Sequence, residues 1–383
     1  MSLVVERLPI DLSTLPETLH KHVAAGAPKP LKMMAARGML PVTPEQNVRV
    51  LYALATGADE EASAAATNSF DDLRADILLM AVSAEKHEGV LDWIADRRSK
   101  DPKVLEAVVT NRAAHAHTVA RVARTADSAL CDIIATNQVR ILQAPVILEQ
   151  IYQNPNARMA TVDRLLELIQ REGVELRGLP GVQQALNSGQ ALFNGGEQDE
   201  NATLFTEEAR RAEEEAARLK NINALPRSER DKVLDEEDAK SKRTSGMLSD
   251  KIARLSISEK VRLATIGSRE ALNLLIRDPN KLVHMAAIRS PRAQDVDYRR
   301  WARNKTLPDG VIHWISNQRD LVRHYDVMLA LCQNPKTPLG ETLKFLNHIR
   351  TNDLKQLASD RNISMQVARQ AKQLYSKRST GRS

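Results

Sequence analysis

The most constraining feature of this sequence is that it resembles itself. Residues 112–156 align with residues 292–336 without a gap, at a constant offset of 180. Seven of the 45 positions are identical, and five of these frame the same interval in both copies: Asn137, Gln138 and Gln153–Pro155 recur as Asn317, Gln318 and Gln333–Pro335. We interpret this as a duplicated array of short helices. Such arrays usually present an extended binding surface.

Composition favours helices throughout. Hydrophobic residues make up 42% of the 383 residues but aromatic residues only 3%, so the core must consist mainly of Leu, Ile, Val, Ala and Met. Ala and Leu are strong helix formers, whereas the aromatic enrichment that strands favour is missing. We therefore expect an all-α fold, with two α-solenoid arrays joined by a charged, partly helical linker.

The first array is expected to span residues 1–171 as a series of short helices. Thr43 can cap a helix that Pro44 begins, and Gln46 completes the capping box. Further helices are predicted at residues 58–69, 70–80, 84–97, 101–110, 115–124, 126–136, 144–153 and 158–171. Each is too short to be stable alone, so each must pack on its neighbours.

A change of pattern marks the middle of the chain. Residues 172–250 contain glycine breaks and many charges, and they are predicted to form a linker with one helix near 206–221. That helix is interpreted as solvated or as part of a flexible linker; a coiled-coil or docking helix is the alternative.

The second array is predicted at residues 251–375, beginning near a capping box of Ser256 and Glu259, and residues 376–383 are predicted to be a frayed basic tail. Asn280, Arg292, Asn304 and Asn317 follow one another at intervals of 12, 12 and 13 residues, which indicates a repeat of about 24 to 26 residues.

Two short motifs resemble a known family. Asn334–Pro338 reads Asn-Pro-Lys-Thr-Pro, and Leu357, Ala358 and Asp360 follow it. These residues resemble the leucine-rich repeat variant family, an α-solenoid related in appearance to HEAT-like repeats. The resemblance implies a fold and no particular function. A founding member carries a cysteine-rich cluster domain, but this chain has only Cys131 and Cys332, so no cluster is implied.

No motif for catalysis or for a cofactor is visible. His115 and His117 lie two residues apart and would point to different sides of a helix, which makes them a poor metal pair. We therefore expect no enzyme activity, no cofactor and no metal. A lesser alternative is a HEAT-like DNA glycosylase, for which Asp295, Asp297, Tyr298 and Trp301 are the nearest approach to a catalytic set.

Charge is distributed unevenly along the chain. Residues 1–240 carry a net charge of −9 and residues 241–383 carry +15, against +6 for the whole chain. A dense basic cluster consists of Arg289, Arg292, Arg299, Arg300, Arg303 and Lys305. We expect these residues to be exposed and to bind an acidic protein partner. Nucleic acid is the alternative partner, and an internal contact with the acidic half is a third.

The chain is thus expected to be a non-enzymatic helical-repeat adaptor or scaffold. The N-terminal residues show no signal peptide, and no window approaches the ~20 apolar residues that span a bilayer, so a cytoplasmic location without membrane insertion is expected. The oligomeric state and the identity of the partner stay open at this point.

Overall fold

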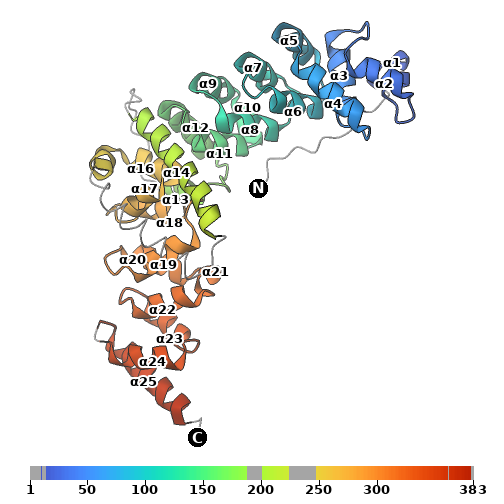
Figure 1. Ribbon diagram of the computed structural model, residues 1–383. Helices are drawn as coiled ribbons and strands as arrows, with labels where there is room; N and C mark the ends of the chain where they lie inside the picture. Colours follow the sequence, from blue (N-terminus) through green and yellow to red (C-terminus); the bar gives the residue numbers. More distant parts are fainter. Residues whose placement is uncertain (1–9, 11–13, 188–200, 224–246, 361, 381–383) are drawn as a thin grey trace. The chain divides into compact units, whose positions relative to one another are not determined.

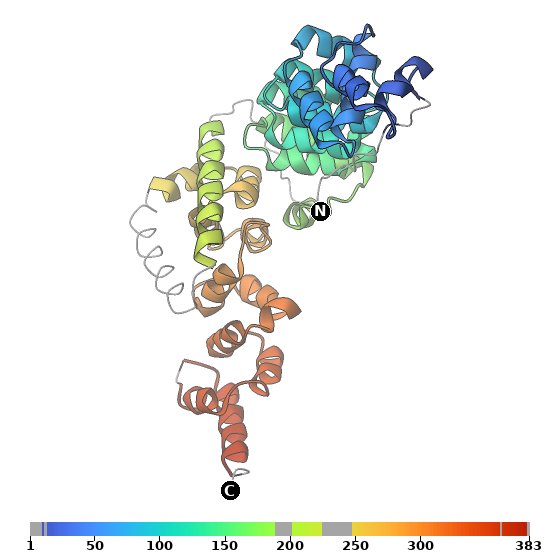
Figure 2. The ribbon, with the colours of Figure 1, turned by 45° about the vertical axis from the view of Figure 1, so that its right-hand side comes forward.

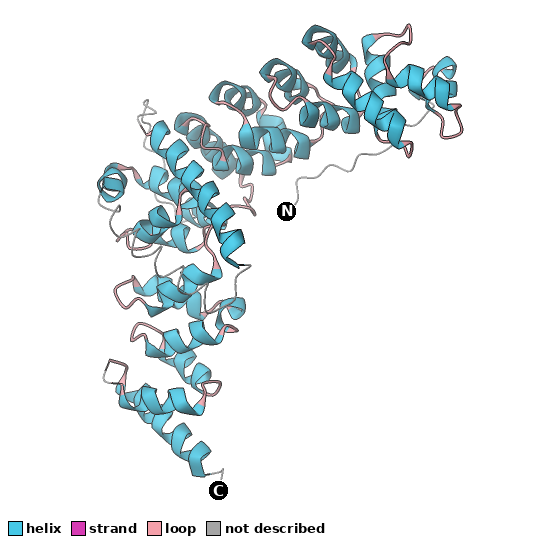
Figure 3. Ribbon diagram, viewed as in Figure 1, coloured by secondary structure: helices cyan, strands magenta, loops and turns pink. Residues whose placement is uncertain are grey.

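The protein is helical throughout the part of the chain that its computed structural model describes, namely residues 10, 14–187, 201–223, 247–360 and 362–380. No strand occurs within these ranges (Figure 3). The expectation of an all-α fold is confirmed. None of the helices in the described ranges combines the length and the apolar character needed to cross a membrane.

The described residues form two compact units, which meet in the sequence at Gly178 and Leu179. Unit 1 contains the described residues up to Gly178, and unit 2 contains those from Leu179 onward. The sequence analysis assigned residues 172–250 to a linker, and the structure differs on this point. Described residues on both sides of Gly178 belong to one or the other unit because they bury apolar side chains in it, among them Leu176 in unit 1 and Val182 in unit 2.

Unit 1 consists of short helices separated by tight connections (Figure 1). They are α1 (Glu17–Val23), α2 (Lys29–Ala36), α3 (Pro44–Ala55), α4 (Glu60–Asp71), α5 (Ala75–Ala84), α6 (Glu88–Arg97), α7 (Pro102–Thr110), α8 (Ala116–Thr125), α9 (Ser128–Thr136), α10 (Gln138–Gln143), α11 (Val146–Gln153) and α12 (Met159–Glu172). The capping box of Thr43 and Gln46 is present at the start of α3. Every predicted helix has a counterpart in unit 1, whereas α1, α2 and α10 were not predicted.

Alternate helices of unit 1 pack on one another. α5 contacts both α3 and α7, and α7 contacts α9; on the other side α8 contacts α6 and α11. Figure 1 shows α5, α7 and α9 following one another along one side of this unit. Apolar side chains such as Leu78, Ile94 and Val108 are fully buried between the helices. Burial between neighbours therefore supplies the stability that helices of two or three turns lack alone.

Unit 2 continues the pattern of short helices. They are α13 (Pro180–Asn187), α14 (Ala202–Asn223), a helical stretch at 247–254, α16 (Ile257–Ile266), α17 (Arg269–Leu275), α18 (Lys281–Ile288), α19 (Asp295–Arg303), α20 (Asp309–Ser316), α21 (Arg319–Val322), α22 (Tyr325–Gln333), α23 (Leu339–Leu346), α24 (Thr351–Ser359) and α25 (Met365–Thr380). The predicted capping box of Ser256 and Glu259 begins α16. α16 packs on α18, α18 on α20 and α19 on α22.

Two elements assigned from the sequence to the linker pack on unit 2 instead. α13 lies against α18, where Gly181 comes so close that a Cβ atom would stand 3.1 Å from Ala286 Cα. α14 packs on α16 and α17, and Figure 2 shows it lying along this part of the unit. Of the two interpretations of the charged helix, the structure has the docked one, because α14 buries an apolar stripe that begins with Leu204 and Phe205.

The predicted frayed tail is also helical as far as Thr380, and residues 381–383 lie outside the described ranges. Arg378 explains this extension. Its guanidinium donates to the carbonyl oxygens of Ile349 at 2.5 Å and Asn347 at 2.6 Å. The side chain thereby ties the end of α25 to the residues between α23 and α24.

The duplication seen in the sequence is present in the structure. α8, α9, α11 and α12 begin at residues 116, 128, 146 and 159, and α19, α20, α22 and α23 begin at residues 295, 309, 325 and 339, within one residue of the offset of 180. The four helices of each copy therefore follow one another at matching intervals, one set in each unit.

A buried asparagine performs the same task in both copies. In unit 1 the Asn154 amide donates to the carbonyls of Ala123 and Ala126, each at 2.8 Å, and accepts from Asn156 N. In unit 2 the Asn334 amide donates to Ala302 O at 2.9 Å and Asn304 O at 3.3 Å, and accepts from Lys336 N. Each amide thus satisfies the free carbonyls at the end of the helix one layer earlier.

Other polar side chains link successive layers at a similar sequence distance. Thr118 donates to Asp92, which lies 26 residues earlier, and Thr161 donates to Asp132, 29 residues earlier. In unit 2 the Trp301 indole donates to Asn273 across 28 residues. The layers therefore recur at an interval slightly longer than the 24 to 26 residues inferred from the sequence.

Candidate interaction site

The six basic residues singled out from the sequence lie around the junction of α18 and α19 in unit 2. Arg289 ends α18, Arg292 lies in the following loop, and Lys305 follows α19, which carries Arg299, Arg300 and Arg303. The prediction that all six are exposed is wrong. Only Arg303 and Lys305 are exposed, and the other four are half-buried. Long guanidinium side chains pack their stems against helices in this way, and a count of charges along the sequence does not reveal it.

Two of the half-buried arginines, Arg292 and Arg299, interact with carboxylates of the protein itself. Arg299 lies 3.7 Å from the Asp326 carboxylate of α22. Burial lowers the pKa of Arg289, and it also lowers the pKa of Arg292, which the nearby carboxylates of Glu213 and Glu215 on α14 partly offset. The basic cluster therefore joins an interface that includes α14.

That interface combines several polar contacts between α14 and unit 2. We call the residues on which α14 rests the α14 seat; they come from α16, α17 and the loop before α19. The seat comprises Glu259, Arg262, Ser268, Arg269 and Arg292. α14 faces the seat with Asn201, which precedes it, and with Phe205, Glu208 and Glu215.

Glu208 is the buried centre of the interface. The residue is 0% exposed, and one carboxylate oxygen accepts from the Ser268 hydroxyl at 2.5 Å. The other oxygen accepts from Arg211 Nη1 at 2.8 Å. A buried carboxylate needs such charge-assisted hydrogen bonds to offset the loss of water. Ser268 thus specifies a carboxylate at this position of the docked helix.

Glu215 occupies the corresponding position two helical turns later. Its carboxylate accepts from the backbone N–H of Arg269 at 2.8 Å. Burial raises the pKa of Glu215, and the neighbouring carboxylates of Glu208 and Asp297 add to this rise, whereas the contact with Arg269 lowers it. Glu215 is therefore held in an environment that opposes its ionisation.

Arg269 connects the seat to the rest of unit 2. Its Nε and Nη2 atoms donate to one oxygen of Asp297 at 2.8 and 2.6 Å, and the other oxygen accepts from Gln294 N. Both side chains are largely buried. Asp297 is thus fully engaged in holding α17 against α19.

Two contacts complete the N-terminal half of the interface. Phe205 of α14 packs its ring beneath the Arg262 guanidinium, with 5.1 Å between Cζ and the ring centroid. Asn201 Nδ2 donates to Glu259 Oε1 at 2.7 Å. Cation–π contacts of a buried arginine are worth about 2 kcal/mol, so Phe205 is an anchor of the docked helix.

The aromatic residues near the basic cluster form part of the core. Trp301 is 2% exposed and contacts Tyr298 edge to face. Tyr298 in turn stacks on Trp314, and burial raises its pKa to about 12. Of the two carboxylates that the sequence suggests for a glycosylase, Asp297 is buried in its contact with Arg269, and Asp295 is exposed, with its carboxylate 3.5 Å from His324 Nε2.

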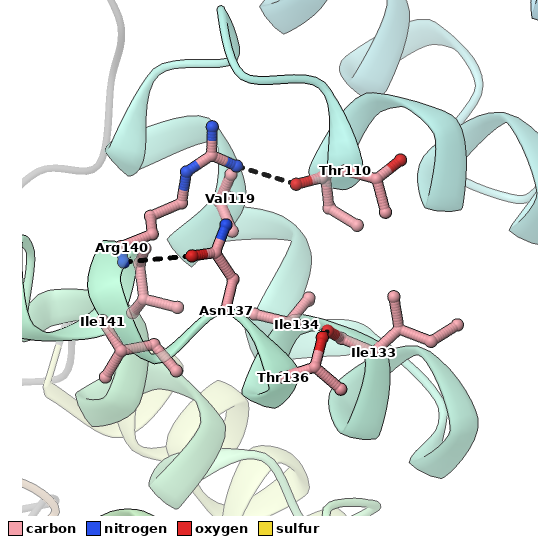
Figure 4. A pocket seen from close by; sticks show the side chains of 10 residues that line it. Thr110, Val119, Ile133, Ile134, Thr136, Asn137, Arg140 and Ile141 are labelled. Carbon is pink, nitrogen blue, oxygen red and sulfur yellow. Dashed lines mark hydrogen bonds between the residues drawn. The ribbon is translucent and has the colours of Figure 1, made fainter.

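Unit 1 contains a small cavity. It encloses about 120 Å³, and apolar side chains such as Ile134 and Ile141 line it together with the polar Thr136 and Asn137 (Figure 4). Its charged wall is Arg140, whose guanidinium donates to the carbonyls of Val109 at 2.7 Å and Asn111 at 2.8 Å. The arginine is thus engaged in closing the end of α7.

Metal ligation finds no support among the described residues, where no three His, Cys, Asp or Glu side chains gather at one point. His115 accepts from His117 N at 3.1 Å and so caps α8. Both cysteines are buried and unpaired with each other.

The α14 seat was not found by sequence reasoning, although a signal exists. Leu204, Phe205, Glu208, Ala209, Ala212 and Glu215 fall on one face of a helix. The many exposed charges on the opposite face obscured this stripe. Ser268 and Arg269 have no distinguishing context in the sequence. Compared with family models, with curated proteins and with solved structures, the chain shows no match.

Proposed function

We propose that the protein is a helical-repeat adaptor that binds another protein through the basic surface of unit 2. In this proposal both units are α-solenoid arrays similar to leucine-rich repeat variant and HEAT-like proteins. Support comes from the contacts between alternate helices and from the asparagine that bridges layers in each unit. The activity would be binding rather than turnover.

The observation that carries the proposal is the docking of α14. This surface of unit 2 already holds a helix. The Ser268 hydroxyl and the backbone N–H of Arg269 donate hydrogen bonds to two carboxylates of that helix. A phosphate backbone could pair with the charges of this surface, but it has no ring to lie against the Arg262 guanidinium as Phe205 does. The chemistry of the surface therefore favours a protein partner over nucleic acid.

The half-buried arginines favour an acidic partner. Burial lowers the pKa of Arg289 and Arg292, because their guanidinium groups have lost water, which the carboxylates of Glu213 and Glu215 partly replace at Arg292. A further carboxylate would stabilise both charges. Arg303 and Lys305 remain exposed beside them and would accelerate the approach of an acidic protein.

The proposal is tested by affinity capture from a native lysate with the full chain, with and without nuclease. The test variant carries Arg303→Glu and Lys305→Glu. A matched control carries Lys100→Glu and Lys103→Glu, which are exposed in unit 1 and change the net charge equally. We expect nuclease-resistant proteins to be captured by the wild type and the control and lost from the test variant.

Recovery dominated by nuclease-sensitive material would overturn the proposal in favour of nucleic acid. Binding of a fluorescent duplex would then weaken by about 0.9 log units per log unit of salt for each phosphate contacted. Equal capture by the test variant and the control would show that the basic surface of unit 2 is not the binding surface.

A further inference from the structure

The helix α14 buries only part of itself against unit 2. Leu204, Phe205, Glu208, Ala209 and Ala212 are all buried. Among residues 213–218, Glu213, Glu214, Ala217 and Arg218 are exposed, and Glu215 and Ala216 are half-buried. The helix is therefore anchored by its N-terminal half.

We propose that the α14 seat is a binding site for an amphipathic helix of a partner protein, and that α14 occupies it as an internal competitor. The inference rests on the proposed function and names the class of partner. The fitting helix carries an adjacent apolar pair, a glutamate three residues after the pair, small residues at the next two contact positions, and a glutamate or glutamine seven residues after the first glutamate.

The spacing of the seat explains this pattern. The Ser268 hydroxyl donates to Glu208, and the backbone N–H of Arg269 donates to Glu215. The two glutamates are seven residues apart, so they lie two turns apart on the same face of the helix. Arg262 covers the aromatic ring that precedes them. A ligand must present an apolar anchor, one carboxylate and, seven residues later, a second side-chain oxygen that accepts a hydrogen bond.

The contacts of α14 leave it open to displacement. The C-terminal half places the carboxylate of Glu215 near those of Glu208 and Asp297, which is an unfavourable arrangement of like charges. On the N-terminal side, an open groove of about 410 Å³ lies between α14 and the stretch 247–254, where Met247 is 80% exposed. A partner helix with a closer apolar fit would gain area that α14 does not cover.

The seat is built by helices that also pack on one another. α16 contacts α17 and α18, and α17 contacts α18. Arg269 is positioned by Asp297 of α19 rather than by α14. The groups that would receive the partner are thus held in place by the layers of unit 2, as a preorganised site requires.

The test uses a fluorescent peptide with the sequence of residues 201–218 as the probe and the full chain as the receptor. The release variant carries Phe205→Ser and Glu208→Lys, which remove the anchor and the central carboxylate of the internal helix. We expect the probe to bind this variant at least tenfold more tightly than the wild type, because the free fraction of the seat limits the apparent affinity.

Three controls define the result. Glu214→Lys makes the same charge change as Glu208→Lys on the exposed face of α14 and should leave the affinity for the probe unchanged. A probe carrying the two release substitutions should not bind. Arg292→Glu, added to the release variant, should weaken the binding of the probe several-fold. If the release variant loses its helical circular dichroism, Phe205→Ala alone provides the comparison.

Equal affinity of the probe for the wild type and the folded release variants, or no binding to either, would overturn the inference. The proposed function can survive that result. If reversing Arg303 and Lys305 still abolishes capture while the release variant captures the same proteins to the same extent as the wild type, the adaptor proposal stands and the internal competitor does not.

Discussion

At the scale of single residues, Asn154 and Asn334 each join two successive helical layers through a buried amide. Replacing Asn154 with Ala removes the amide that donates to the carbonyls of the buried residues Ala123 and Ala126 and accepts from the N–H of Asn156. We expect the free energy of unfolding to fall by about 3 kcal/mol, as lost buried hydrogen bonds dictate. Urea denaturation followed by circular dichroism measures this change.

Asn334→Ala should have a similar effect in the other unit, because its amide makes the same contacts. Asn68→Ala, at an exposed position of α4, should change stability by no more than about 0.5 kcal/mol. A loss as small as that control at both buried sites would show that water replaces the amide.

The thiol of Cys332 provides a second prediction. Burial raises its pKa to about 12, so its thiolate fraction at pH 8 is only about one in ten thousand. We expect iodoacetamide to leave Cys332 unmodified in the native protein and to modify it once urea unfolds unit 2. Mass spectrometry of both samples measures this difference, and rapid native modification would contradict the burial of the thiol.

Single residues also show where prediction from the sequence succeeds. The capping boxes at Thr43 and Ser256 were correctly predicted, because a cap depends on side chains within four positions. The exposure of Arg289 and Arg292 was not, because it depends on what packs beside them from distant parts of the chain.

At the scale of elements, the docking of α14 is sensitive to pH through Glu215. Burial raises its pKa, so the docked helix holds this proton more tightly than the undocked one. The penalty for ionisation is absent below the ordinary value of 4.5 and grows as pH rises through the raised pKa. Docking therefore strengthens on acidification. The groups that face Glu215 are Glu208, Arg269, Asp297 and, through its charge, Arg292.

Amide hydrogen exchange in α14, corrected for intrinsic rates, measures this effect. We expect protection in the wild type to fall as the pH rises above 4.5, the ordinary pKa of a glutamate. Glu215→Gln keeps an oxygen for the Arg269 N–H but cannot ionise, so it should remove the pH dependence and raise protection at neutral pH. Unchanged pH dependence in this variant would assign the effect to another group.

Helices were easier to predict than their packing. Nine helices of unit 1 were located, most of them to within a few residues, from short apolar runs and caps. The 22-residue charged helix α14 was also located, but it was interpreted mainly as solvated. Its contact stripe alternates apolar and glutamate side chains. A hydrophobic pattern treats every glutamate as exposed. Glu208 is recognised as a buried contact residue once its partner Ser268 is known.

At the scale of the whole molecule, the unit boundary at Gly178 makes a prediction about fragments. A fragment of residues 179–383 retains α13 and α14, which bury Val182, Leu186 and Phe205 against unit 2. We expect it to unfold cooperatively in urea. A fragment of residues 251–383, which follows the boundary inferred from the sequence, exposes the surfaces beneath both helices and should bind the dye ANS strongly.

Equal dye binding by the two fragments would show that α13 and α14 contribute little to the core of unit 2. The sequence placed the boundary at 250 because composition changes there. The structure moves it because a helix belongs to the unit on which it buries its side chains, and that contact joins residues such as Gly181 and Ala286 that lie far apart in the sequence.

The bridging asparagines have a final consequence, for the chemical ageing of the chain. An asparagine deamidates when the backbone nitrogen of the next residue loses its proton and attacks the side-chain amide. Asn154 and Asn334 are each followed by proline, whose nitrogen has no proton to lose. Asn111, whose amide donates to the carbonyls of Val82 and Glu85, is followed by Arg112 and lacks this protection. During long storage, the layer contact at Asn111 should therefore be the first of the three to acquire an aspartate.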